Sequence, residues 1–243
     1  MNEREEFDTA IIATDVKTHM EIASFFLTHG KNVVIEKPVV SNMQDLNELY
    51  RIAEENSTKA LALFHWQYAD EIIYLKDHIT DFGTISRIEV EIHDDYLESD
   101  GSVRPDRCGM GGSWYDSGIN ALSFLDQLTD LSDLQLISKE YRTDSVSGQI
   151  IYADHIYRNT DGIEIRLNNS WRYKDKTKTT RISCSRGTVT VIHSEQKVYI
   201  NDRIVFDRPS EDCLAGHYIN MFNADLSAQK KDNVKALYKY LFG

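Results

Sequence analysis

The sequence predicts two α/β parts: a short parallel sheet in which strands alternate with helices, and then a mainly antiparallel sheet with helices on one face. Two observations support this. Apolar runs alternate with helical patterns up to about residue 66, whereas strand patterns separated by turn residues dominate from about residue 85 onward. The chain also has 243 residues, 41% of them hydrophobic, which is enough to form a sizeable core.

The first part is expected to form three parallel strands joined by two helices. The run Thr9-Ala10-Ile11-Ile12-Ala13-Thr14 is typical of a buried strand, and Gly30 ends the helical pattern that follows it. After Pro38, Ser41 or Asn42 can cap the next helix. The expected order is strand 9–14, helix 18–29, strand 33–36, helix 42–55 and strand 59–64. Right-handed crossovers between such strands give a parallel sheet.

The second part reads as consecutive hairpins interrupted by helices. Turn pairs Asp161-Gly162, Arg186-Gly187 and Asn201-Asp202 separate strand patterns. The expected strands are 85–92, 133–141, 149–157, 163–171, 179–185, 188–193, 197–200 and 204–206, and the expected helices are 69–79, 117–128, 212–229 and 232–241. This division predicts domains at residues 1–66 and 67–243.

Composition excludes several functions. The net charge of −12 disfavours nucleic acid and anionic membrane surfaces as partners, and no apolar run approaches the roughly 18 residues of a membrane span. The N-terminus has no signal-peptide pattern, and Cys108, Cys184 and Cys213 form neither a zinc pattern nor a disulfide framework, so we expect a cytoplasmic protein. The eight histidines show no paired ligand spacing, and we assign no metal.

Several motifs in order along the chain resemble the Gfo/Idh/MocA oxidoreductase family. Glu36-Lys37-Pro38 follows a strand, and Ala13-Thr14-Asp15 ends the strand before it, with His19 just beyond. The segment from Gly111-Gly112 to Asp116-Ser117-Gly118-Ile119-Asn120 is similar to the family's Gly-Gly and Asp-x-Gly-x-His pattern, with Asn120 in the place of the histidine. Together with Phe64-His65, this resembles the L-arabinose and D-galactose 1-dehydrogenase branch.

The resemblance implies an NAD- or NADP-dependent dehydrogenase that oxidises the C1 hydroxyl of an aldose to a lactone. In this role Asp116 is the expected base, and Lys37 is the expected catalytic cation that holds the reacting hydroxyl. Asn120, four residues after Asp116 on the same helix face, is expected to bind sugar hydroxyls, as are His65 and Asp94. The expected cofactor-binding residues are Thr14, Asp15, His19, Glu36 and Lys37.

Structural alternatives exist for each of these residues. Asp116 by itself could be a helix N-cap, and Asn120 a surface polar residue. Lys37 before a proline could be a solvated strand end, and His65 beside Trp66 a packed histidine.

The sequence departs from the family pattern in one large respect. A dinucleotide fold has its phosphate-binding glycine turn after the first of six strands, and the three strands expected here correspond to the last three. The sole glycine cluster, Gly109-Met110-Gly111-Gly112, has the wrong spacing for that turn. We therefore expect a truncated Rossmann-like sheet, possessing part of the nicotinamide wall only, in a chain that binds NAD(P) weakly by itself. The alternative function is a non-catalytic, domain-deleted relative that binds a sugar or a partner chain.

Two surfaces are expected to promote self-association. The antiparallel sheet leaves one face open, and Ile151, Ile163, Ile165 and Val189 are expected to lie on it and to favour a homo-oligomer. Strand 9–14 is expected to be an unguarded apolar edge, at which Ile12→Lys should raise solubility.

Overall fold

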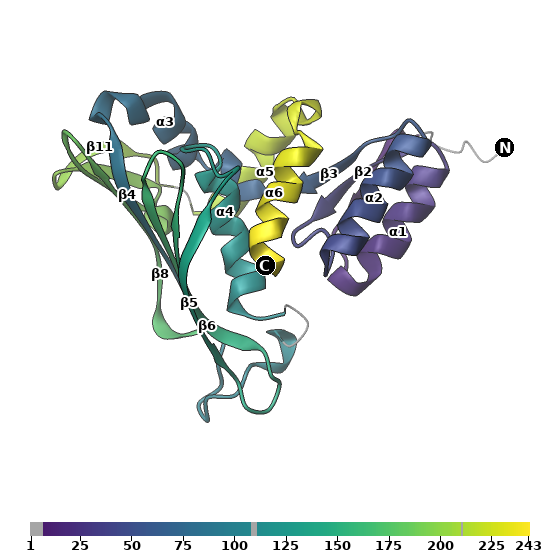
Figure 1. Ribbon diagram of the computed structural model, residues 1–243, viewed down its shortest axis with the longest axis horizontal. Helices are drawn as coiled ribbons and strands as arrows, with labels where there is room; N and C mark the ends of the chain where they lie inside the picture. The colour runs from purple at the N-terminus through teal and green to yellow at the C-terminus, as the bar shows by residue number, and fades with distance from the viewer. Residues whose placement is uncertain (1–6, 108–110, 210) are drawn as a thin grey trace. The chain divides into compact units, whose positions relative to one another are not determined.

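The chain forms two compact units, each with its own sheet. A computed structural model describes residues 7–107, 111–209 and 211–243. One unit combines the chain up to Phe64 with Leu226–Gly243, and the other spans His65–Asp225. The first contains a three-stranded parallel sheet and the second a mainly antiparallel sheet of eight strands (Figure 1). The predicted fold class is therefore confirmed.

In the first unit, strands and helices alternate as the sequence predicts. Parallel strands β1 (Thr9–Ile12), β2 (Asn32–Glu36) and β3 (Ala60–Leu63) are linked by helices α1 (Val16–Thr28) and α2 (Met43–Glu55), which pack side by side (Figure 1). Local chemistry sets where the helices begin. Asn42 caps α2 by accepting the Asp45 N–H at 2.8 Å, and Asp15 caps α1.

The last helix, α6 (Lys231–Phe242), belongs to the first unit and not to the second, where we expected all of residues 67–243. It packs against α2, and its fully buried Tyr238 accepts a hydrogen bond from the Val39 N–H through its hydroxyl oxygen. Just before α6, the Gln229 side-chain amide bonds both the N–H and the C=O of Ala62, at 2.7 and 2.9 Å. These bonds occupy backbone groups on the outer edge of β3.

Strand β1 lies at the other edge of this sheet, and its two isoleucines have opposite environments. Within the described residues β1 pairs with β2 alone. The Ile11 side chain is 57% exposed, whereas Ile12 is 2% exposed. The expectation that Ile12 could be replaced by lysine is therefore wrong, because its side chain lies in the core and Ile11 is the exposed one.

Ile11→Lys is expected to raise solubility without unfolding the first unit, because it places charge on an apolar sheet edge. Ile12→Lys is expected to destabilise this unit by about 3–5 kcal/mol, the cost of an unpaired buried charge. Light scattering at rising concentration and thermal melts followed by circular dichroism measure both effects. Equal behaviour of the two variants would contradict the assignment of faces.

The second unit is built on one twisted sheet in the order β11-β10-β9-β8-β4-β7-β6-β5. β4 and β7 are parallel and every other pair is antiparallel. The strands are β4 (Ile85–Asp95), β5 (Gln135–Thr143), β6 (Ile150–Arg158), β7 (Glu164–Ser170), β8 (Arg172–Cys184), β9 (Gly187–Ile192), β10 (Lys197–Ile200) and β11 (Arg203–Asp207). The helices are α3 (Asp70–His78), α4 (Ile119–Leu125) and α5 (Cys213–Asn223).

The turn between β10 and β11 and the start of the expected helix 117–128 depend on local backbone conformation. Asn201 and Asp202 join β10 to β11 with φ of 45° and 68°, as a two-residue hairpin turn requires. The expected helix 117–128 instead begins as a π-helical turn, Trp114–Gly118, followed by the shorter α4. Gly118 permits this turn, since a Cβ there would lie 2.5 Å from the Trp114 ring.

The two faces of the large sheet differ sharply in chemistry. Ile165 and Val189 are fully buried, and Ile151 and Ile163 are 6% and 7% exposed. The expectation that these four residues lie on the open face is thus wrong, because all four are buried. Ile165 pairs with the buried Ile88 of β4, and Ile151 packs against Val103 and Trp171.

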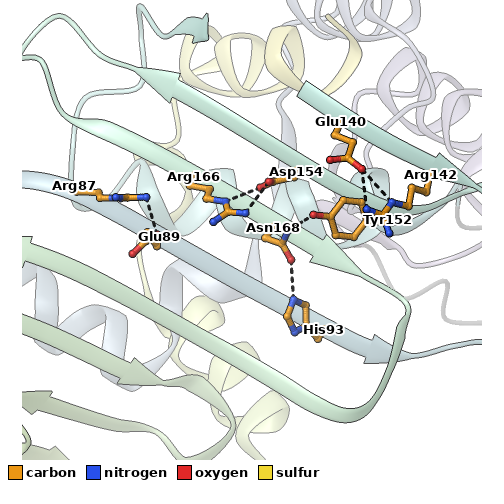
Figure 2. Close-up of polar contacts among 9 residues, drawn as sticks. All are labelled: Arg87, Glu89, His93, Glu140, Arg142, Tyr152, Asp154, Arg166 and Asn168. Carbon is orange, nitrogen blue, oxygen red and sulfur yellow. Dashed lines mark hydrogen bonds and ion pairs between the residues drawn. The ribbon is translucent and has the colours of Figure 1, made fainter. Parts of the chain in front are cut away.

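The open face is lined by polar pairs that cross the strands (Figure 2). Arg166 binds Asp154 through two hydrogen bonds of 2.9 and 2.8 Å. The His93 ring donates from Nε2 to the side-chain Oδ1 of Asn168 at 2.8 Å. The side-chain Nδ2 of Asn168 donates to the Tyr152 hydroxyl at 3.1 Å. Paired charge and hydrogen bonding, and not apolar packing, characterise this face.

Candidate functional site

In the first unit, His19 connects the ends of two neighbouring parallel strands. Its Nε2 lies 3.1 Å from the Thr14 carbonyl oxygen, just after β1. Its Nδ1 lies 3.2 Å from the carbonyl oxygens of Pro38 and Val39, just after β2. The side chain is 2% exposed. His19 is expected on the nicotinamide wall. In the structure its ring contacts the backbone of both segments that contain the other expected cofactor residues.

Those residues form two short polar groups. After β1, Asp15 caps α1 and pairs with Lys17 at 3.2 Å, and hydrogen bonding from Lys17 lowers the pKa of the Asp15 carboxyl. Thr14 and Thr18 share a hydroxyl–hydroxyl bond of 2.7 Å. After β2, the Glu36 carboxylate accepts the Lys37 N–H at 2.7 Å. Because β1 and β2 are adjacent and parallel, both groups lie at the end of the sheet where the carboxyl ends of the strands meet.

These polar groups suit the nicotinamide end of a dinucleotide better than its pyrophosphate. Threonine, carboxylate and ammonium groups at the carboxyl ends of parallel strands suit the polar edge of a nicotinamide riboside. A pyrophosphate prefers an uncapped helix N-terminus. Here the α1 N-terminus is capped by the Asp15 carboxylate, and α2 is capped by the Asn42 side chain and has the Asp45 carboxylate in its first turn. Negative side chains at these positions oppose phosphate.

In the second unit, Asp116 and Asn120 are placed by the π-helical turn. Asp116 is 6% exposed, and its N–H donates to the Gly112 carbonyl at 3.0 Å. The Asn120 amide donates to the Asp116 carbonyl at 3.3 Å, while its Oδ1 is buried without a hydrogen-bond partner. Asp116 lies inside the turn, so the helix N-cap alternative is wrong for it, and the 9% exposed Asn120 is not a surface residue.

Asp94 lies at the end of β4 on the helix-covered face. It is 4% exposed and accepts a bond from the Ser117 hydroxyl at 3.5 Å. The Lys178 ammonium lies 3.4 Å from its other oxygen. The structure thus brings Asp94 next to the residue that follows Asp116, although 22 positions separate the two aspartates in the chain, from 94 to 116.

Besides burial, the charges of Asp94 and Asp116 both raise the pKa of the same group, the Tyr96 hydroxyl. Burial raises the pKa of Tyr96 to about 12, and the charges of Asp94 and Asp116 add to the increase. The Arg107 guanidinium lies over the ring at 4.4 Å and acts in the opposite direction. The Tyr96 hydroxyl therefore remains protonated at neutral pH and can donate a hydrogen bond.

The structure places His65 in a buried histidine cluster. Its Nδ1 lies 3.1 Å from Nδ1 of His217, and the two rings stack with centroids 5.4 Å apart. Close by, His193 binds Glu71 at 2.9 Å and Thr180 at 2.8 Å. These surroundings match the packed-histidine alternative, while a substrate role for His65 stays a prediction.

Another buried histidine, His155, packs under the π-helical turn. The Trp114 ring stacks on it at 3.8 Å and the Tyr141 hydroxyl lies 2.8 Å from its Nε2. Burial lowers the pKa of His155 from 6.5 to about 4, with a smaller effect from Lys139. The imidazole is therefore neutral throughout the physiological range.

We expect His155 to make stability depend on pH. Below about pH 6.5 the unfolded chain protonates this histidine, whereas the folded chain does so only near pH 4. As the pH falls from about 6.5 to about 4, the free energy of unfolding should therefore decrease by up to about 3 kcal/mol. At higher pH, His155 should not affect the free energy of unfolding. Urea denaturation at several pH values should show a flatter profile for His155→Gln. The exposed-site control, His29→Gln, should keep the wild-type profile, and identical profiles for all three proteins would contradict this linkage.

Four residues near the candidate site escaped the sequence reasoning: Ser117, Tyr96, Lys178 and Trp66. Ser117 and Tyr96 adjoin predicted site residues in sequence, so a wider window around Asp116 and Asp94 could have found them. Lys178 had no sequence signal, because only the pairing of β8 with β4 brings it to Asp94. Among the described residues, no group of three His, Cys, Asp or Glu side chains has an arrangement that could hold a metal ion. None of the described helices is long and apolar enough to cross a membrane.

Comparison with protein families gives a match at the N-terminal end. Residues 1–64 match the Gfo/Idh/MocA model, described as an oxidoreductase family with an NAD-binding Rossmann fold. This agrees with the nicotinamide cofactor expected from the sequence.

Relatives extend the similarity along the chain. The scyllo-inositol 2-dehydrogenase (NADP(+)) IolU of Bacillus subtilis is 32% identical over 81 residues, which are 33% of this chain and 25% of IolU. The uncharacterized protein YMR315W of Saccharomyces cerevisiae is 23% identical over 176 residues, 69% of this chain and 50% of the relative. The chain thus spans half or less of the length of these two relatives.

A solved structure shows the same fold. KijD10, a 3-ketoreductase from Actinomadura kijaniata in complex with TDP-benzene and NADP, superimposes with a TM-score of 0.76 at 16% identity, covering 98% of this chain and 76% of that chain. The match to the Gfo/Idh/MocA model is thus carried by residues 1–64, and the similarity to YMR315W extends over 69% of the chain.

Proposed function

We propose that this chain acts in an NAD(P)-dependent oxidoreductase of the Gfo/Idh/MocA family, and that its substrate is an aldose oxidised at C1 to the lactone. One observation supports this above the others. In the second unit the carboxylates of Asp94 and Asp116 are buried, and the Oδ1 of Asn120 is buried with no hydrogen-bond partner. A buried acceptor without a partner requires a donor, and a polyhydroxylated substrate supplies one.

The name of one relative, IolU, points to a polyhydroxylated substrate. IolU is named for scyllo-inositol and KijD10 for keto reduction, and both names include NADP or a complex with it. The choice of an aldose over a cyclic polyol follows from the motif resemblance around Asp116 and Asn120.

The proposed chemistry assigns one task to each residue. The nicotinamide cofactor, when bound, accepts the hydride from C1. The O–H electron pair forms the new carbonyl bond, and Asp116 takes the proton as general base. Lys37 donates a hydrogen bond to the reacting oxygen, and Asn120 and Asp94 bind other hydroxyls. Thr14, Asp15 and Glu36 hold the nicotinamide end in this proposal, with His19 fixing their backbone.

Substrate oxidation by the full-length protein tests this function. The protein would be incubated with NAD⁺ or NADP⁺ and a panel of pentoses, hexoses and scyllo-inositol, with cofactor reduction followed by absorbance and products by NMR. The expected result is aldose-dependent reduction with a lactone product, lost in Lys37→Ala. Reduction with inositol alone would exclude the C1 assignment.

A second function, sugar or partner binding without catalysis, is favoured by the carboxylates at the helix N-termini, Asp15 as the cap of α1 and Asp45 in the first turn of α2. Calorimetric titration of this chain with NADH and NADPH tests the non-catalytic alternative. Because pyrophosphate contacts are lacking in the described helix N-termini, we expect binding much weaker than micromolar. Micromolar binding to either would exclude the non-catalytic alternative.

Self-association through the open sheet face also remains a proposal. The cross-strand polar pairs on that face (Figure 2) offer matched charges and hydrogen bonds to a second copy, in place of the apolar packing expected from sequence. Light scattering coupled to gel filtration measures the mass, and the proposal expects a dimer or larger. If Arg166→Glu leaves that mass unchanged, the interface lies elsewhere.

A further inference from the structure

Lys178 is an ammonium group held on the helix-covered face of the large sheet. It pairs across the sheet with Ile92, which points into the core. Its Nζ lies 3.4 Å from Asp94 Oδ1 and 5.7 Å from the centroid of the Trp66 ring. A carboxylate and an aromatic face thus position this cation together, and its side chain is 32% exposed, whereas the Asp94 side chain is 5% exposed.

The ion pair of Asp94 and Lys178 can make further hydrogen bonds to a ligand. Asp94 receives contacts of 3.4 Å from Lys178 and 3.5 Å from Ser117, both at the long end of the range for hydrogen bonds. A carboxylate accepts up to about four hydrogen bonds and an ammonium donates three. Ser117 directly follows Asp116 in the π-helical turn, so this capacity adjoins the proposed base.

The charges in this region favour a neutral ligand. Asp94 and Asp116 together contribute two negative charges, and Lys178 contributes one positive charge. Arg107 and Asp106, which also act on Tyr96, form an ion pair at 3.3 Å and so offset each other. Both carboxylates act on the Tyr96 hydroxyl, so they lie within electrostatic range of the same point. A phosphate or carboxylate would meet this net negative charge, whereas a diol can donate to Asp94 and accept from Lys178 at once.

We propose that Asp94 and Lys178 form a specificity-determining subsite for two adjacent hydroxyls of a neutral sugar, in which Lys178 is the donor to one hydroxyl. This inference rests on the proposed function, since it assumes a sugar substrate. It adds Lys178 to the site, and it excludes sugar phosphates and sugar acids as preferred substrates.

Binding of sugars to this chain without cofactor tests the subsite. Saturation-transfer NMR and calorimetry would compare a neutral aldose, its single-deoxy analogues, its phosphate and its acid. In Lys178→Met, which keeps an unbranched side chain against Trp66 but removes the charge, we expect the neutral aldose to bind about 10–100-fold more weakly. Lys178→Arg should restore much of the affinity. The exposed control on the same strand, Lys176→Met, should bind as the wild type does.

Deoxy analogues distinguish a direct contact from a structural role. The analogue that lacks the contacted hydroxyl should bind wild type and Lys178→Met equally, because the lost bond is the same one. An equal loss for every analogue, or tighter binding of the phosphate or the acid, would overturn the subsite. Undiminished aldose binding by Lys178→Met would overturn the subsite alone, whereas a wild-type chain that binds no sugar would overturn the proposed function as well.

Discussion

For the proposed dehydrogenase activity, replacing Asp116 by alanine is expected to lower kcat by about 10²–10⁴-fold at neutral pH, the usual cost of removing a general base. Asp116 lies inside the π-helical turn at 6% exposure and caps no helix, so its carboxylate has no structural role as an N-cap to lose. Asn120→Ala is the matched comparison, from the first turn of the next helix. It should raise KM more than it lowers kcat, since it removes a substrate hydrogen bond.

Steady-state kinetics on both variants, with cofactor saturating, separate the two roles. The large loss should appear in kcat for Asp116→Ala and in KM for Asn120→Ala. A near-normal kcat in Asp116→Ala would place the base elsewhere, whatever the effect of Asn120→Ala.

Gly112→Ala is expected to destabilise the second unit by about 3 kcal/mol or more. Gly112 has φ of +106°, a conformation that costs other residues about 1–3 kcal/mol. A Cβ there would also lie 2.5 Å from the Ile150 carbonyl oxygen and 2.7 Å from its nitrogen, backbone atoms that cannot rotate away. Gly112 bridges to Ile150 just before the turn that contains Asp116, so the variant should lose activity too.

A second glycine provides the control. Gly162 has φ of +81°, but a Cβ there meets no atom within 4 Å, so Gly162→Ala should cost only about 1–2 kcal/mol. All three tryptophans, Trp66, Trp114 and Trp171, lie in the second unit, so fluorescence during urea denaturation reports on that unit. Equal costs for the two glycine variants would show that the close approach to Ile150 relaxes easily.

Much of the candidate site could be found from sequence only through motifs. Lys37, Asp116 and Asn120 were selected by resemblance, and the structure adds that Asp116 and Asn120 are buried and joined by a hydrogen bond. Lys178 belongs to no such motif. Its placement beside Asp94 depends on the pairing of β8 with β4, so no sequence window could show it.

Features that arise from neighbouring residues can be predicted from the sequence alone. Asn42 starts α2 because its side chain caps a backbone N–H three residues on, and Asn201-Asp202 make a tight hairpin because both tolerate positive φ. Alternation of apolar runs and helical patterns likewise predicted a parallel sheet followed by a mainly antiparallel one.

Only the tertiary structure decided what depends on distant partners. Ile11 and Ile12 have the same side chain, yet their exposure differs because the core covers one face of β1. Helix α6 joins the first unit through Tyr238, which bonds a residue 199 positions away. Lys178 meets Asp94 because β8 pairs with β4 in one register. Side-chain periodicity shows that a strand has two faces, but the choice of buried face and strand neighbour depends on contacts far apart in the chain.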